Sequence, residues 1–157
     1  MSVSPLPMPA QAVPHQGEAL LLDSLLHADD DSVSAALTVR PATAFSERDG
    51  SLPGWVGPEL MAEAVAAYAG CRSLRDKGRT APIGLILGIR DYTCAVARFE
   101  AGQALIVDAV RSSEDEEGRG VFDCRISGGG RLLASGTLTV FQPPDEAFLD
   151  AERRRDE

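Results

Sequence analysis

The stretch LPGWVGPELMAEA, residues 52–64, leads into the one long helix that this sequence predicts. Its two proline–glycine pairs mark a turn, and proline suits the first turn of a helix. Small residues then follow on every side, and from Leu60 to Cys71 only Glu63 is charged. A surface helix would instead show one apolar stripe and one charged face. The helix, which we expect to end near Gly78, is therefore predicted to be mostly buried.

Strand patterns lie on both sides of this helix. Residues 32–40 alternate apolar with small or polar side chains, as a half-buried strand does. An acidic connection at residues 114–118 and the glycines 128–130 are turn signals, and they predict that the last three strands form an antiparallel meander. Two strands, one buried helix and four more strands predict an α+β fold in which the sheet curls around the helix, the hotdog architecture. The predicted strands are 20–26, 32–40, 83–92, 104–111, 120–127 and 132–141.

The length of 157 residues and the hydrophobic content of 44% suit one domain. Four prolines within residues 1–14 predict an extended N-terminal arm. We expect the hotdog domain over residues 15–142 and a charged C-terminal tail over residues 143–157.

The formal net charge of -9 argues against binding to nucleic acid or to anionic membranes, which require a basic surface. The sequence has no signal-peptide pattern at its start and no apolar stretch long enough to insert into a membrane. The cysteines are three in number and have no CxxC spacing, which predicts buried, reduced thiols. We therefore expect a cytoplasmic protein.

Acid/base chemistry has one carboxylate candidate and two imidazole candidates. Glu59 falls in the first turn of the predicted helix, where the helix dipole favours negative charge. Alone, it can equally be a carboxylate that only stabilises the helix, by a few tenths to about 1 kcal/mol. An imidazole can act as a base near neutral pH, and the 2 histidines are His15 and His27. His27 precedes three aspartates and is expected to be an exposed surface residue, and His15 taken alone is more often structural.

Three segments resemble the β-hydroxyacyl-carrier-protein dehydratases of the FabZ kind and their ApeP relatives. Residues 14–23, PHQGEALLLD, resemble the LPHRxPxLLLD segment of this group. Residues 55–64 resemble the WVGxExMAQ helix start of the ApeP branch, and residues 84–92, GLILGIRDY, resemble its GxLLGxRxY strand. The three segments occur in the right order over residues 14 to 92.

The resemblance implies removal of water from a 3-hydroxyacyl thioester on an acyl carrier protein, in fatty-acid or aryl-polyene-type synthesis. This reaction needs a base beside the thioester carbonyl, an acid for the leaving hydroxyl and a donor for the enolate oxygen. His15 is expected to be the base, Glu59 the acid or an orienting group, and Gly57 an amide donor. Gly84 and Tyr92 are expected to contact the substrate, by close backbone approach and by lining an acyl tunnel.

The resemblance also implies partners. Carrier proteins are acidic, and between Cys71 and Arg98 basic residues outnumber acids, so Arg72, Arg75 and Arg79 are expected carrier contacts. The same side chains can instead complement the C-terminal dipole of the helix. Hotdog sheets commonly pair edge to edge, so we expect a homodimer or a heterodimer with another hotdog subunit. No metal or redox cofactor is implied, because the sequence shows no ligand cluster or phosphate-binding glycine motif.

Two positions depart from the family pattern. Phe45 stands where the FabZ motif HFPGxPxxPG has its catalytic histidine, and Glu63 stands where the family has glutamine. Either His15 replaces the missing base, or the chain is a non-catalytic partner of an active dehydratase. A hotdog thioesterase, in which Glu59 activates water, is a further alternative. Glu63 would also repel Glu59, because the two are four residues apart on the helix.

Overall fold

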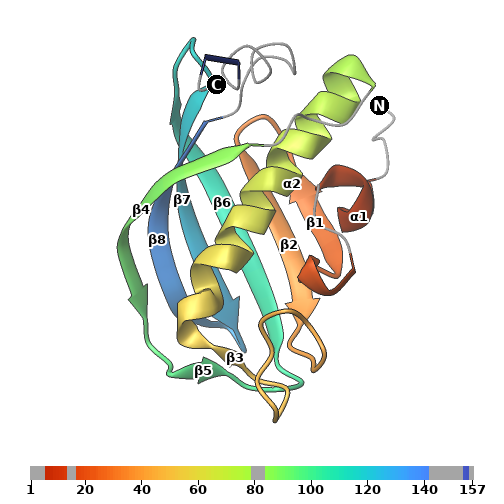
Figure 1. The fold of residues 1–157 in the computed structure, drawn as a ribbon, viewed down its shortest axis with the longest axis vertical. Helices are drawn as coiled ribbons and strands as arrows, with labels where there is room; N and C mark the ends of the chain where they lie inside the picture. Colours follow the sequence, from red (N-terminus) through yellow and green to blue (C-terminus); the bar gives the residue numbers. More distant parts are fainter. Residues whose placement is uncertain (1–5, 14–16, 79–83, 142–153, 156–157) are drawn as a thin grey trace.

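A single long helix, α2 (Gly57–Lys77), lies against one face of a six-stranded antiparallel sheet that curves around it (Figure 1). The computed structural model describes residues 6–13, 17–78, 84–141 and 154–155. The strand order is β1-β2-β6-β7-β8-β4. This is the predicted hotdog arrangement, which is confirmed. The strands are β1 (Ser24–Ala28), β2 (Ser32–Thr38), β4 (Leu85–Cys94), β6 (Ala104–Glu114), β7 (Arg119–Gly128) and β8 (Arg131–Phe141).

The pairing of the strands confirms the predicted meander, since β6, β7 and β8 are consecutive antiparallel neighbours. The β1–β2 hairpin joins the sheet beside β6, and β4 pairs with β8. The two edges are therefore β1 and β4. Two short strands that the sequence did not predict, β3 (Leu52–Pro53) and β5 (Arg98–Phe99), pair with each other beside the start of α2 (Figure 1).

The core lies between α2 and the inner face of the sheet. The alternation in β2 places Val33, Ala35 and Leu37 inside, as predicted. Removal of this apolar surface from water is the main force that holds the helix against the sheet. The helix ends at Gly78, which takes a left-handed conformation (φ 67°) and donates its amide to the carbonyl of Leu74. Helix residues with no exposed surface are Leu60, Met61, Ala64 and Ala67.

Part of the segment predicted to be an extended arm is helical instead. The short helix α1 (Pro9–Ala12) begins with a proline, and Ala12 and Val13 are buried. Gly70 of α2 permits this packing, because a Cβ atom there would lie 1.8 Å from the carbonyl oxygen of Ala12.

The predicted boundary at His15 and almost all of the tail at 143–157 lie outside the described residues. None of the helices in the described ranges has the length and apolarity needed to cross a membrane.

Gly70→Ala should weaken the packing of α1 on α2, since backbone atoms must move to admit the methyl group. We expect a loss of about 1–3 kcal/mol in the free energy of unfolding, measured by urea denaturation. In a variant without residues 1–13 the same substitution should stabilise the protein by up to about 1 kcal/mol, because alanine favours helix over glycine. A full-length Gly70→Ala protein more stable than wild type would contradict the close contact.

Candidate active site

Glu59 is exposed in the first turn of α2, and the start of that helix is firmly held. It is preceded by a 3-10 turn, η2 (Gly54–Val56). The Gly54 amide donates to the carbonyl of Ala97 at 2.9 Å, and the Tyr92 hydroxyl donates to the carbonyl of Gly54 at 2.6 Å. The exposed Glu59 therefore lies on a helix start whose backbone is fixed by hydrogen bonds.

Gly57 and Tyr92 lie together, but not in the roles predicted for them. The Gly57 amide donates to the carbonyl of Gly54, so it is not the open donor that the sequence suggested. A Cβ atom at Gly57 would lie 1.9 Å from the Tyr92 hydroxyl oxygen, so glycine is needed there for space. Burial raises the pKa of Tyr92, which keeps its hydroxyl a neutral donor to Gly54. Both residues hold the helix start in place.

Gly84 is not brought to Glu59 within one chain. It is exposed and directly precedes β4, whose first residue, Leu85, pairs with Phe141. Tyr92 lies near the other end of the same strand. At about 3.3 Å per residue, the two predicted substrate contacts are roughly 25 Å apart along β4. Gly84 can therefore join a site at Glu59 only from another subunit.

His15 and Arg79 lie outside the described residues, but the chain that follows His15 is described from η1 (Gly17–Ala19) onward. It runs to α2, where the Leu21 amide donates to both carboxylate oxygens of Glu63 at 2.9 and 3.2 Å. The Leu22 amide donates to Oε1 of Glu63 at 2.9 Å. Glu63 is only 1% exposed, whereas Glu59 is exposed, so the two carboxylates lie in different surroundings although they are four residues apart on the helix.

The positive patch predicted at the end of α2 is balanced by acids. Arg72 pairs with Glu114 at 3.0 Å, and Arg75 pairs with Asp30 and, at 3.0 Å, with Asp76. Glu114 comes from β6 and Asp30 from the β1–β2 turn, so the local sequence around the arginines did not show them. Arg72 and Arg75, two of the expected carrier contacts, are therefore paired with acids within the chain.

Tyr68 of α2 connects these charges. Its hydroxyl donates to the carbonyl of Asp30 at 2.6 Å and accepts from Arg111 at 3.0 Å. Its ring packs edge-on against Phe122 with 5.2 Å between ring centres. Burial raises the pKa of Tyr68, so the hydroxyl stays protonated at neutral pH. One polar network thereby joins α2, the β1–β2 turn and β6.

The remaining candidates have structural surroundings. Phe45, at the position of the FabZ histidine, is partly buried and packs against the core. His27 is exposed and hydrogen-bonds to Asp29 at 2.7 Å, as a surface residue was expected to. Cys71, Cys94 and Cys124 are free thiols, but only Cys124 is fully buried. In the described ranges no three or more His, Cys, Asp or Glu side chains are grouped to hold a metal ion.

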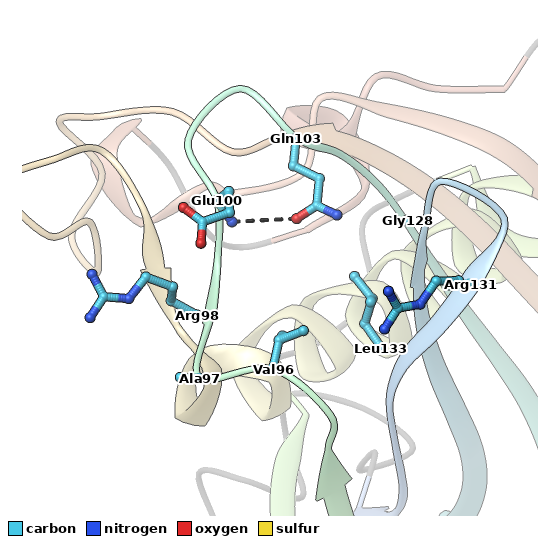
Figure 2. Close-up of a pocket in the computed structure, with 8 residues that line it drawn as sticks. All are labelled: Val96, Ala97, Arg98, Glu100, Gln103, Gly128, Arg131 and Leu133. Atoms are coloured by element: carbon cyan, nitrogen blue, oxygen red, sulfur yellow. Dashed lines mark hydrogen bonds between the residues drawn. The ribbon is translucent and has the colours of Figure 1, made fainter.

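A pocket of about 420 Å³ opens beside the start of α2, between the β4–β6 connection and the β7–β8 turn (Figure 2). Its wall at Val96 and Ala97 belongs to the backbone that supports Gly54. No predicted site residue lines the pocket. Among the described residues, the backbone at Val96 and Ala97 is therefore its only connection with the start of α2, where Glu59 lies. The lining residues are Val96, Ala97, Arg98, Glu100, Gln103, Gly128, Arg131 and Leu133.

Sequence reasoning missed two exposed apolar features. Trp55, just before α2, is 68% exposed, and Leu85, Ile86 and Leu87 of β4 are 47%, 55% and 55% exposed. An apolar run in a predicted strand is typical of a core, so the sequence pattern indicated that Leu85, Ile86 and Leu87 would be buried. An edge strand with exposed apolar side chains is instead a surface for pairing with another chain.

The sequence matches the family of ApeP-like proteins, described as ApeP dehydratase, over residues 7–150. No protein with a curated function is similar enough in sequence to match. A solved structure described as the dehydratase heterocomplex ApeI:P from Xenorhabdus doucetiae has 28% identity and a TM-score of 0.82. That alignment covers 92% of this chain and 96% of the other.

More distant structures share the fold alone. The phenylacetic acid degradation protein PaaI from Thermus thermophilus has 22% identity and a TM-score of 0.57, covering 80% of this chain and 96% of its own. Zebra fish thioesterase superfamily member 2 has 16% identity and a TM-score of 0.57, covering 76% of this chain and 80% of its own.

Gly57→Ala should destabilise the protein by about 1–3 kcal/mol, because the new methyl group collides with the Tyr92 hydroxyl. Tyr92→Phe alone should cost about 1 kcal/mol through the lost hydrogen bond. The double variant should regain part of the Gly57→Ala loss, since ring carbons still lie 2.8 and 3.1 Å from the added Cβ. Thermal or urea unfolding measures all three, and full additivity of the two losses would contradict the contact.

Proposed function

The chain belongs to the ApeP-like dehydratase family, which it matches over residues 7–150, and we propose that it dehydrates a 3-hydroxyacyl thioester carried by an acyl carrier protein. The product is the trans-2-enoyl thioester. Fatty-acid or aryl-polyene-type synthesis is the pathway class in this proposal.

In the proposed reaction the His15 imidazole removes a proton from the carbon beside the thioester carbonyl. The electron pair forms the new double bond, and the carbon–oxygen bond of the 3-hydroxyl group breaks. Glu59 gives its proton to the departing hydroxyl, which leaves as water. A hydrogen-bond donor other than the Gly57 amide must bind the enolate oxygen, because that amide already donates to Gly54.

The observation that carries this proposal is the attachment of the chain after His15 to the helix of Glu59. The Leu21 and Leu22 amides bind Glu63, which lies one helical turn beyond Glu59. Four residues of helix rise only about 6 Å. The segment that leads back to the proposed base is therefore bound to α2 close to the proposed acid. This supports one site for the two groups.

A second hotdog subunit completes the proposed site. The similar ApeI:P structure is a heterocomplex, and β4 presents an unpaired apolar edge at Leu85, Ile86 and Leu87. Two β4 strands paired antiparallel place the start of one beside the end of the other. Gly84 of one subunit would then approach the helix start of its partner, where Trp55 is exposed. The partner is either a second copy of this chain or a related dehydratase subunit.

An acyl carrier protein is the proposed substrate carrier, with Arg72, Arg75 and Arg79 as its proposed contacts. Arg72 and Arg75 must then exchange Glu114 and Asp30 for carboxylates of the carrier. Exposed ion pairs contribute at most about 1 kcal/mol, so such an exchange costs little.

A non-catalytic partner subunit is the second candidate function. Phe45 occupies the position of the FabZ histidine and packs against the core, so this chain lacks the usual base at that position. In this case the paired subunit supplies the catalytic groups, and this chain completes the fold of the assembly.

His15→Ala and Glu59→Gln should each lower the dehydration rate on the order of 100-fold or more, because each removes one proton-transfer group. The measurement follows formation of the enoyl thioester from a 3-hydroxyacyl carrier protein. Glu47→Gln, an exposed carboxylate in the 41–51 loop, is the matched control and should keep wild-type activity.

Wild-type protein that is inactive alone, and that raises the activity of a paired dehydratase no more than His15→Ala and Glu59→Gln do, would establish the non-catalytic function. Hydrolysis of the thioester without dehydration would establish the thioesterase alternative. Variants as fast as an active wild type would exclude His15 and Glu59 as catalytic residues.

Leu87→Lys should disrupt assembly with the partner subunit, because it places a charge on the apolar edge of β4. Leu132→Lys is the matched control: Leu132 is 52% exposed on β8, which is not an edge strand, and Leu87 is 55% exposed. Analytical ultracentrifugation of the purified assembly should show dissociation for Leu87→Lys only. An unchanged sedimentation coefficient for both variants would place the interface elsewhere.

A further inference from the structure

Charged side chains, not a neighbouring strand, bind the backbone of residues 20–22, between η1 and β1. The amides of Leu21 and Leu22 donate to Glu63. The carbonyls of Leu20 and Leu21 accept from the two terminal nitrogens of Arg40, at 2.8 and 3.2 Å. Residues 20–22 are thus held between a carboxylate on their donor side and a guanidinium on their acceptor side.

Arg40 is itself placed by the first hairpin. It pairs with Asp23 at 3.1 Å, and the other carboxylate oxygen of Asp23 accepts the amide of Thr38 at 2.7 Å. The Asp23 amide donates to the carbonyl of Ala36 at 2.9 Å, which begins the pairing of the hairpin. Arg40 therefore connects the hairpin to the backbone that precedes it, at the carbonyls of Leu20 and Leu21.

The chemistry of this arrangement explains why both side chains are charged. Burial of a carboxylate is costly unless strong donors surround it, and hydrogen bonds to a charged acceptor are stronger than neutral ones. Glu63 is 1% exposed and accepts from two backbone amides. The opposite charge of Arg40 suits the carbonyl side of the same residues. Leu21 and Leu22 are buried and Leu20 is partly buried, so their backbone groups would otherwise lack these partners.

We propose that Glu63 and Arg40 are positioning residues for the dehydration site: they set where the chain that follows His15 meets α2, one turn from Glu59. The catalytic part of this inference rests on the proposed function. The attachment itself does not, because it concerns the described contacts of residues 20–22.

The position of each oxygen predicts which substitutions are tolerated. Oε1 of Glu63 lies 2.9 Å from both amides, and Oε2 accepts from the Leu21 amide at the longer distance of 3.2 Å. Glu63→Gln can keep both short bonds through its single carbonyl oxygen, whereas Glu63→Met keeps neither. Arg40→Met removes the hydrogen bonds to the carbonyls of the same segment. Because the Arg40 side chain is 39% exposed, this variant should fold even if Glu63→Met does not. Val65→Ala, a buried change on the same helix that leaves these bonds intact, is the control.

Amide hydrogen exchange tests the attachment directly. In Glu63→Met and Arg40→Met, the Leu21 and Leu22 amides should exchange at least about 10-fold faster relative to the amide of Asp23. Glu63→Gln and Val65→Ala should change this ratio by less than about twofold. Unchanged Leu21 and Leu22 protection in both methionine variants would overturn the proposal.

Kinetics test the positioning role. In Glu63→Met and Arg40→Met kcat should fall about 10-fold or more while KM stays within about twofold, since misplacement of a catalytic group affects the reaction step. Glu63→Gln should restore a kcat near that of wild type. A wild-type kcat in variants whose Leu21 and Leu22 amides exchange faster would overturn the positioning role.

A wild type that is inactive both alone and with a paired subunit would refute the proposed function and leave the positioning inference to be decided by NMR. His27→Gln leaves His15 as the sole histidine, because the chain has 2. In that background the His15 ring protons should have different chemical shifts in Glu63→Met than in Glu63→Gln. Identical chemical shifts in both variants would show that Glu63 does not place His15.

Discussion

The close packing of α2 against its surroundings is the constraint on which the structure depends. At Gly57 and at Gly70 a single added carbon atom would collide with an oxygen, of the Tyr92 hydroxyl and of the Ala12 carbonyl respectively. Glycine at these two positions lets β4 and α1 approach the helix directly. The position of the helix, and with it the positions of Glu59 and Glu63, is therefore determined by steric contact at its start and in its C-terminal half.

The polar side chains of this helix act as ties to distant segments. Glu63 binds the backbone at Leu21 and Leu22, and Tyr68 binds the carbonyl of Asp30. Arg72 reaches Glu114 of β6. Most of the helix surface is apolar and would pack in several ways, whereas these polar contacts each have one geometry. They connect the first hairpin to the helix and so place the N-terminal part of the proposed site.

Helix and strand patterns were predictable because their signals are local. The buried helix with its end near Gly78 and the meander of the last strands are confirmed. The small strands β3 and β5 were not predictable, since each has two residues and forms only because the chain passes the helix start. The ion pairs of the arginines at the end of α2 were not predictable for a related reason: a count of nearby charges in the sequence omits Glu114 and Asp30.

The sequence by itself determined the hotdog class, the family and the candidates Glu59 and His15, because these follow from periodicity and from short motifs. Only the tertiary structure decided what the individual groups contact. The sequence marked Gly57 as a donor, but the fold places its amide against Gly54 and leaves no space beside Tyr92. The sequence predicted only that Glu63 repels Glu59, whereas the fold binds the Glu63 carboxylate to amides 41 and 42 residues away. Such contacts arise when distant segments are brought together by burial of the core, and no local pattern encodes them.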